Sequence, residues 1–206
     1  MNDISNKYFV IDNFYEKPDF VRKLALSLDY HDVSKNNYPG FQSNFPCLGK
    51  GVLNKFESLI DAEIDVESSE QLMGHFRWIP SHGESQLKVH TDMMDWTVVI
   101  YLSPLGPKEA GTNLYCHKQS GLIGPPSLVK MAELGFSSFA DYEEKIVVPD
   151  TLDPEAWEVI GNVDYKYNRC LLFKGNELFH SHTTGFGHDL DTARMTQNFF
   201  FNVKRS

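Results

Sequence analysis

The stretch KVHTDMMDWTVVIYL, residues 88–102, carries the two features from which the fold is predicted. Residues 96–102 form a run of aromatic and β-branched side chains, which is typical of a buried strand. Just before this run, His90 and Asp92 are two positions apart, and an extended chain places such a pair on one face. Taken alone, the His-x-Asp pair is equally compatible with a surface histidine beside a turn aspartate.

Similar short strands are predicted on both sides of this stretch. Segments rich in β-branched and aromatic residues are separated by turns that contain Gly and Pro. The predicted strands are residues 8–12, 72–79, 86–91, 96–102, 111–117, 145–149, 169–174, 178–183 and 193–203. So many short strands predict a mainly β fold, namely a jelly roll, or double-stranded β-helix. We expect one domain, residues 1–206, with its core at about 71–203 and helical support in 1–70.

Helices are predicted before and within the series of strands. Apolar residues at helical spacing after Pro18, and again near 50–61, predict two N-terminal helices that pack outside the sheet. Between them, the composition of residues 31–49 predicts an ordered loop, whose segment 36–46 is a candidate cover for a site. A helical insertion is predicted near 125–160, in the segments SLVKMAEL, SSFADYEEK and PEAWEVI. Insertions of this size often serve as a lid or a substrate wall.

Composition narrows the range of partners and locations. The formal net charge is −9, which disfavours a nucleic-acid partner. The sequence has no apolar run of roughly 18 residues and no signal-peptide pattern, so we expect no membrane span and a cytoplasmic location. Cys47, Cys116 and Cys170 form no CxxC pair, and we expect reduced thiols rather than a zinc site or disulfides. The sequence leaves the oligomeric state open.

A distal histidine completes a candidate metal site. In RCLLFKGNELFHSHTTGF, residues 169–186, an apolar strand meets a Lys-Gly-Asn turn, and a second short apolar segment then delivers His180. Two imidazoles and one carboxylate suit non-haem iron(II) and leave positions open for a cosubstrate and dioxygen. His182 is the rival third ligand, but His180 directly follows the apolar pair and is preferred. Asp95 has the wrong strand parity to replace Asp92, and His188 is expected to be solvated.

A buried arginine is predicted near the C-terminus. In ARMTQNFFFNV, residues 193–203, alternation places Arg194, Thr196, Asn198 and Phe200 on one face of a strand whose two faces are both expected to be buried. A buried guanidinium needs an anionic partner, and it binds a carboxylate through two parallel hydrogen bonds. The partner is either an internal Asp or Glu or the carboxylate of a ligand, to which the Thr196 hydroxyl can add a third hydrogen bond.

In the order His-x-Asp, distal His and Arg-x-Thr, the chain resembles the 2-oxoglutarate and iron(II)-dependent dioxygenases over residues 71–203. The early segment DNFYEKPDFVRKLAL is similar to the N-terminal helix of the small prolyl-hydroxylase-like members. This resemblance implies that His90, Asp92 and His180 bind iron, and that Arg194 with Thr196 anchors the far carboxylate of 2-oxoglutarate. The segment AGTNLY, residues 110–115, resembles a strand in which Gly-Gly-Thr is common, with alanine here in place of the first glycine.

The resemblance also implies a reaction. Dioxygen and 2-oxoglutarate are consumed, succinate and carbon dioxide are released, and a C–H bond of a small molecule, an amino acid or a peptide side chain is hydroxylated. Because related halogenases lack the carboxylate that corresponds to Asp92, hydroxylation is favoured over halogenation, with desaturation or demethylation as alternatives.

Several further residues are candidates for binding, and two other functions compete. Asn113 and Asn198 are candidate contacts to 2-oxoglutarate or substrate. Candidate substrate residues at the mouth of the barrel are Arg77, Trp78, Tyr101 and Tyr115, although Trp78 and Tyr101 fit the core equally well. The competing functions are a cupin-like metalloprotein that does not use 2-oxoglutarate and a non-catalytic jelly-roll binding module.

Overall fold

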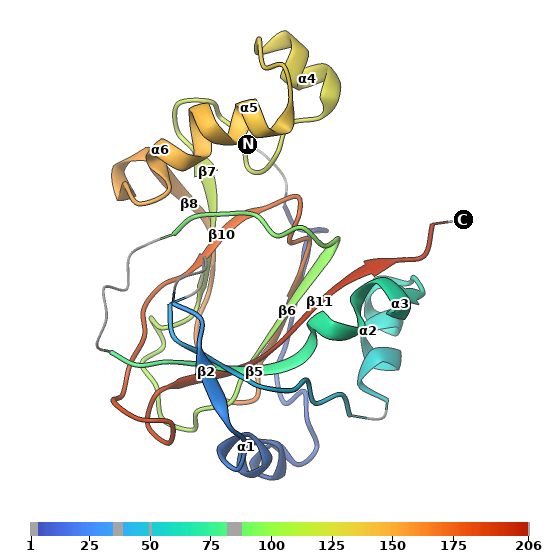
Figure 1. Ribbon diagram of the computed structural model, residues 1–206, viewed down its shortest axis with the longest axis vertical. Coiled ribbons are helices and arrows are strands. Elements are labelled where there is room, and N and C mark those ends of the chain that lie inside the picture. Colours follow the sequence, from blue (N-terminus) through green and yellow to red (C-terminus); the bar gives the residue numbers. More distant parts are fainter. Residues whose placement is uncertain (1–3, 35–38, 50, 82–87, 206) are drawn as a thin grey trace.

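The computed structural model describes residues 4–34, 39–49, 51–81 and 88–205, and shows a mainly β molecule built from two antiparallel sheets (Figure 1). The larger sheet has the strand order β1-β9-β6-β11-β5-β3-β2, and β4 also pairs with β11. Its strands are β1 (Tyr8–Ile11), β2 (Tyr30–Asp32), β3 (Phe41–Ser43), β4 (Ile64–Asp65), β5 (Met73–Ile79), β6 (Trp96–Tyr101), β9 (Cys170–Phe173) and β11 (Arg194–Val203). The smaller sheet has the order β10-β7-β8, with β7 (Thr112–His117), β8 (Trp157–Val163) and β10 (Phe179–His182).

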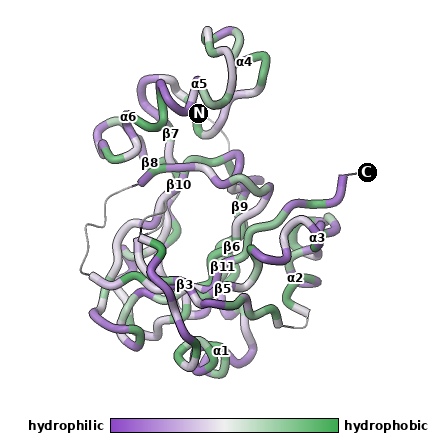
Figure 2. Tube along the Cα trace, in the orientation of Figure 1, coloured by the Kyte–Doolittle hydropathy of each residue, from purple (hydrophilic) through white to green (hydrophobic). Residues whose placement is uncertain are grey.

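The helices cover the outsides of these sheets. The larger sheet is flanked by three helices, α1 (Pro18–Leu26), α2 (Val52–Ile60) and α3 (Val66–Ser69). A 3-10 turn (Glu70–Leu72) follows α3. The insertion lies at the other end, beside β7 and β8 (Figure 1). It contains α4 (Leu128–Glu133), α5 (Phe139–Tyr142), a π-helical turn (Glu143–Val147), α6 (Val148–Asp150) and a 3-10 turn (Pro154–Ala156). Green and purple segments both occur along α1 in Figure 2, as expected for an amphipathic helix on a sheet.

Strand alternation separates two apolar layers. On β6, Trp96, Val98 and Ile100 face the N-terminal helices, where they pack with residues such as Phe56. Val99 and Tyr101 face the smaller sheet and join a second apolar cluster. A third cluster binds the insertion to the outer face of the smaller sheet, and its buried members are Val89, Tyr115, Met131, Tyr142, Val147, Trp157 and Phe179. The inner face, between the two sheets, is the one that receives the candidate site.

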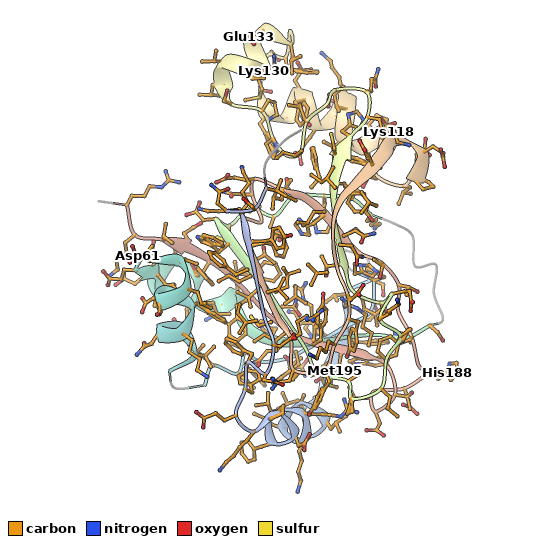
Figure 3. The ribbon with its side chains drawn as sticks, turned by 180° about the vertical axis from the view of Figure 1, so that it is seen from behind. Asp61, Lys118, Lys130, Glu133, His188 and Met195 are labelled. Carbon is orange, nitrogen blue, oxygen red and sulfur yellow. The ribbon has the colours of Figure 1, made fainter. Side chains whose placement is uncertain are left out.

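The parity predicted for the last strand is confirmed. Met195 (labelled in Figure 3), Phe199 and Phe201 belong to the cluster beside the helices. Arg194 and Asn198 are also buried and face inward, so both faces of this strand are covered. Because a strand alternates strictly, the apolar character of one face dictated where the arginine on the other face would point.

Other predictions were wrong, and local packing explains them. Residues 145–149 are helical rather than extended, because Val147 packs one helical turn against the aromatic residues of the third cluster. The segment PEAWEVI is helical only at Pro154–Ala156, and the rest begins β8, which pairs with β7 and whose first and last residues, Trp157 and Val163, are buried. The predicted loop 31–49 contains strand β3, which pairs with β2 and with β5.

The predicted strand at 86–91 is reduced to a single bridge between His90 and His180, and residues 86 and 87 lie outside the described part. No helix in the described ranges has both the length and the apolar composition that crossing a membrane requires.

Candidate metal centre and cavity

Three side chains from distant parts of the sequence meet between the sheets. His90 and Asp92 precede β6, and His180 lies on β10. Two backbone hydrogen bonds join the histidines, from His90 N to His180 O (3.1 Å) and from His180 N to His90 O (2.9 Å). Asp92 Oδ2 is 3.2 Å from His180 Nε2, and Asp92 Oδ1 is 3.8 Å from His90 Nε2. One potential ligand atom from each of the three lies within 4.8 Å of the others.

The backbone sets the protonation of both imidazoles. His90 Nδ1 lies 2.8 Å from the carbonyl oxygen of Lys88, and His180 Nδ1 lies 2.9 Å from that of Leu178. A carbonyl can only accept a hydrogen bond, so each Nδ1 donates to it and each Nε2 is the ring atom available to a metal ion. Burial, followed by the neighbouring His180, lowers the pKa of His90 to about 4, which keeps this ring neutral at pH 7.

Asp92 is held as an anion by its neighbours. Burial by itself raises the pKa of Asp92, but the interaction with His180 and the hydrogen bond from the hydroxyl of Thr97 outweigh it and place that pKa below its usual range. Thr97 Oγ1 donates a hydrogen bond to Asp92 Oδ2, and the Asp92 backbone N–H donates to Gly175 O (2.9 Å). Two imidazoles and one carboxylate, with their Nε2 and oxygen atoms converging, fit a divalent ion of the iron(II) type.

A cavity of about 530 Å³ opens from this centre. Its wall includes the three candidate ligands and inward-facing residues of β5, β6 and β11, among them Arg77, Arg194 and Asn198. The volume lies within the range of small-molecule sites, roughly 300–1,000 Å³. The candidate metal centre and the buried arginine predicted from the sequence therefore share one cavity.

Arg194 is almost completely buried, with only 2% of its surface exposed. Its Nε donates to Ala110 O (2.9 Å), one terminal nitrogen donates to Gly111 O (3.3 Å), and its Cζ lies 5.4 Å from the ring centre of Tyr101. No Asp or Glu among the described residues forms an ion pair with it, so the internal salt bridge considered from the sequence is not found there. A buried cation without an internal counter-charge favours an anionic ligand in the cavity.

The segment at 110–115 contributes to this arrangement through its glycine. A Cβ atom added to Gly111 would lie 1.9 Å from the carbonyl oxygen of Val163, so only glycine fits where β7 meets β8. The same close approach directs the carbonyl groups of Ala110 and Gly111 at Arg194. Ala110 stands where the similar strand of the dioxygenases commonly has glycine, and it is fully buried. Its carbonyl oxygen accepts the hydrogen bond from Arg194 Nε.

The other cofactor candidates are placed differently. Asn198 lines the cavity and accepts a hydrogen bond from Thr196 Oγ1 (2.7 Å), whereas Thr196 itself is fully buried and not part of the wall. Asn113 lies on the opposite face of β7, where it bonds to Asn162 (2.6 Å) and Tyr115 (3.3 Å). The structure thus brings Asn198, but not Asn113, to the cavity.

Of the substrate candidates, only Arg77 lines the cavity. Trp78 stacks on Phe41, with ring centres 4.2 Å apart, on the helix side of the sheet. Tyr115 packs beneath the insertion. Tyr101 lies under Arg194 with no exposed surface, and its hydroxyl is 2.9 Å from Thr112 Oγ1.

The rival ligands do not join the three-residue group. His182 lines the cavity, and burial, assisted by Arg194, lowers its pKa to about 3, but its ring lies outside the group. Asp95 accepts hydrogen bonds from Asn176 (3.1 Å) and from the backbone N–H of Val203 (3.2 Å), away from the centre. His188 is exposed at the edge of the molecule, as expected (Figure 3).

Sequence reasoning missed Thr97 and Gly175 as neighbours of Asp92. A Cβ atom on Gly175 would lie 2.2 Å from Thr97 Oγ1 and 3.0 Å from Asp92 Oδ2, so this turn is packed directly against the carboxylate. The Lys-Gly-Asn turn was visible in the sequence, but its contact with residues 92 and 97 depends on how β9 pairs with β6.

A family model described as "Family of unknown function (DUF6445)" matches residues 2–201. The chain belongs to this family. A comparison with curated proteins gives no match. Among solved structures, HygX from Streptomyces hygroscopicus with nickel, 2-oxoglutarate and hygromycin B bound is similar, with a TM-score of 0.55, 14% identity and coverage of 96% of this chain and 84% of HygX.

Two more solved structures are similar over nearly the whole chain. A Pseudomonas putida prolyl-4-hydroxylase has a TM-score of 0.46 and 12% identity, covering 99% of this chain and 96% of its own. The Fe(II)/α-ketoglutarate-dependent dioxygenase TqaL has a TM-score of 0.47 and 12% identity, covering 98% and 85%. HygX has the highest TM-score of these three structures. Its likeness confirms, for the fold, the resemblance to iron(II) and 2-oxoglutarate-dependent dioxygenases that we expected from the sequence.

Proposed function

We propose that this member of DUF6445 is a non-haem iron(II) and 2-oxoglutarate-dependent dioxygenase with a jelly-roll core. The observation that carries the proposal is the position of Arg194, a buried cation that faces the same cavity as His90, Asp92 and His180 and has no ion pair within the described residues. A metalloprotein that does not use an anionic cosubstrate would have to bear the cost of this buried charge without a counter-charge.

Each group has a defined role in this proposal. His90 Nε2, His180 Nε2 and the Asp92 carboxylate would hold iron(II), and Arg194 would bind the far carboxylate of 2-oxoglutarate. When both are bound, they supply the oxidising chemistry by which dioxygen hydroxylates a substrate C–H bond while 2-oxoglutarate is converted to succinate and carbon dioxide. One oxygen atom enters the substrate and the other enters succinate, so the reaction balances without an additional reductant.

The protein's own residues prepare the site before any ligand arrives. The carbonyl groups of Lys88 and Leu178 fix the tautomers of the two histidines, and Thr97 fixes one oxygen of Asp92. The carbonyl groups of Ala110 and Gly111 orient the Arg194 guanidinium, so that little of its conformational entropy remains to be lost when a ligand binds. These fixed groups favour one orientation of the cosubstrate in the cavity.

The substrate is proposed to be a small molecule or a peptide side chain. The likeness to HygX, which was solved with hygromycin B bound, supports a small-molecule substrate. A non-catalytic binding module is the second candidate, but it offers no reason for two histidines to present their Nε2 atoms toward an ionised carboxylate.

Aerobic turnover tests the proposal. Purified protein is incubated with iron(II), 2-oxoglutarate and ascorbate, and succinate is measured with and without a mixture of candidate substrates. We expect succinate to form above the protein-free rate and to disappear in His90→Ala. Succinate at the blank rate under all conditions, with iron bound, would favour the binding module.

A further inference from the structure

The segment that carries His90 belongs to neither sheet and is joined to β10 by a single bridge. His90 exchanges both of its backbone hydrogen bonds with His180. The residue before it, Val89, turns its backbone groups to the opposite edge, because successive residues of an extended chain alternate in this way. The partner at that second edge therefore helps to determine where His90 is held.

Thr151, a residue of the insertion, occupies this second edge. The Val89 N–H donates a hydrogen bond to Thr151 O (3.1 Å), and the Thr151 hydroxyl donates to Val89 O (2.8 Å). One residue thus binds both backbone groups of Val89. The segment lies between Thr151 on one edge and His180 on the other, with two hydrogen bonds on each side.

Thr151 is itself fixed, because its neighbour Asp150 is bound to the smaller sheet. Asp150 Oδ2 lies 2.8 Å from Nε2 of His117, the last residue of β7. Trp157 Nε1 donates to Asp150 O (2.8 Å) at the start of β8. His117 has no exposed surface, and its Nδ1 lies 2.8 Å from Ser120 Oγ. A buried network in which each ring nitrogen has a partner holds the end of α6 in one place.

Apolar packing supports the same contact between the insertion and the metal centre. The Val89 side chain has no exposed surface and packs in the third cluster with Tyr142 and Val147 of the insertion. The insertion was a candidate lid or substrate wall, but none of the described residues that line the cavity belongs to it. Its contact with the site runs through Val89 instead.

We propose that Thr151 is a positioning residue for the iron ligand His90, and that the insertion supports the metal centre rather than covering the cavity. This inference rests on the proposed function, because it takes His90 as a ligand. The hydrogen bonds at both edges restrict the backbone of this segment, and the contact of His90 Nδ1 with Lys88 O then orients the ring. Loss of the support at one edge should therefore weaken metal binding.

Metal affinity in variants of Thr151 tests the inference. Cobalt(II), whose visible spectrum reports its coordination geometry, is titrated anaerobically into the metal-free protein in competition with a chelator. Thr151→Val keeps the shape of the side chain and removes the hydroxyl that binds Val89 O. We expect about tenfold weaker cobalt binding and an altered spectrum, as for other groups that orient a metal ligand. Thr151→Ser keeps the hydroxyl and should bind cobalt nearly as tightly as the wild type.

Thr183→Val is the matched control. Thr183 is also partly buried, its hydroxyl donates to the backbone carbonyl of a distant residue, Glu109, and it lies outside the described wall of the cavity. Both variants should lower the melting temperature of the metal-free protein to a similar extent. Only Thr151→Val should weaken cobalt binding, because a threonine with a purely structural role changes stability without changing the affinity of the folded site.

Hydrogen exchange in the wild type tests the same contact without a substitution. Coupling between two sites is reciprocal, so a metal ion bound at His90 must strengthen the contact that strengthens its own binding. We expect cobalt to slow amide exchange in residues 147–153. Exchange in α4, at the far tip of the insertion where Lys130 and Glu133 are labelled in Figure 3, should not change. This measurement decides alone if Thr151→Val fails to fold.

The outcomes separate this inference from the proposed function. If the wild type binds cobalt but Thr151→Val binds it equally well, or loses no more affinity than Thr183→Val, the inference is overturned and the proposed function stands. Exchange in residues 147–153 that does not respond to cobalt would also overturn it. If the wild type binds neither cobalt nor iron(II), the proposed function fails and the inference falls with it.

Discussion

The hydrogen bond from Thr97 to Asp92 offers a sharp test of how the metal centre is supported. Replacing Thr97 with valine keeps the shape of the side chain and removes the hydroxyl that donates to Asp92 Oδ2. Thr97 is only 2% exposed, so water cannot readily take its place. Asp92 Oδ2 then keeps its neighbour His180 at 3.2 Å, but loses the donor that fixes its orientation.

The expected magnitude follows from this geometry. A hydrogen bond to a charged group contributes about 1.5–3 kcal/mol, and about 1.4 kcal/mol corresponds to a factor of ten in affinity. We therefore expect Thr97→Val to weaken iron(II) binding by about 10- to 100-fold, which is the usual effect of removing a group that orients a metal ligand. The pKa of Asp92 should rise at the same time, because the hydroxyl is one of the groups that lower it.

The assay is an anaerobic titration of the metal-free protein with iron(II) or cobalt(II), in competition with a chelator. Thr97→Ser should restore most of the affinity, because it keeps the hydroxyl. Thr112→Val is the matched control, since it removes another buried threonine hydroxyl on the cavity wall, one that lies near Tyr101 rather than a candidate ligand. Equal affinities in the wild type and Thr97→Val, or an equal loss in Thr112→Val, would refute the reasoning.

Four other substitutions probe the same cavity. Gly175→Ala places a Cβ atom 2.2 Å from Thr97 Oγ1, and it should lower stability by about 1–3 kcal/mol and weaken metal binding; an unchanged melting temperature and metal affinity would contradict the contact. Arg194→Ala should weaken 2-oxoglutarate binding far more than iron binding, as measured by calorimetry with each ligand, whereas an equal loss of both would indicate a structural arginine. His180→Ala should abolish iron binding and His182→Ala should not; the reverse result would make His182 the third ligand.

The candidate site was largely predictable because strands obey a simple rule. Residues an even number of positions apart on a strand share a face, so Arg194 and Asn198 could be grouped before any fold was known. His90 and Asp92 were grouped by the same rule, although the predicted strand is reduced there to a single bridge at His90. The apolar run before His180 also indicated that this histidine would be carried into the interior. Thr196 was placed on the correct face by the same rule, but its hydroxyl is directed at Asn198 instead of the cavity.

What the sequence did not reveal depends on contacts between distant segments. Gly175 meets Asp92 only because β9 pairs with β6, and strand pairing is not encoded by any local pattern. Residues 145–149 contain the β-branched run of a strand, yet they are helical because the insertion buries Val147 among aromatic side chains. Local propensity is a weak guide where tertiary packing offers a competing gain.

The central claim is that one cavity binds iron(II) through His90, Asp92 and His180 and binds 2-oxoglutarate through Arg194. An anaerobic titration of 2-oxoglutarate into the iron(II)-loaded protein, followed by visible absorption, tests it most directly. We predict a weak charge-transfer band that saturates at one equivalent in the wild type and requires a far higher concentration in Arg194→Gln, although iron remains bound. No band in the iron-loaded wild type, or the same titration curve in both proteins, would contradict the account.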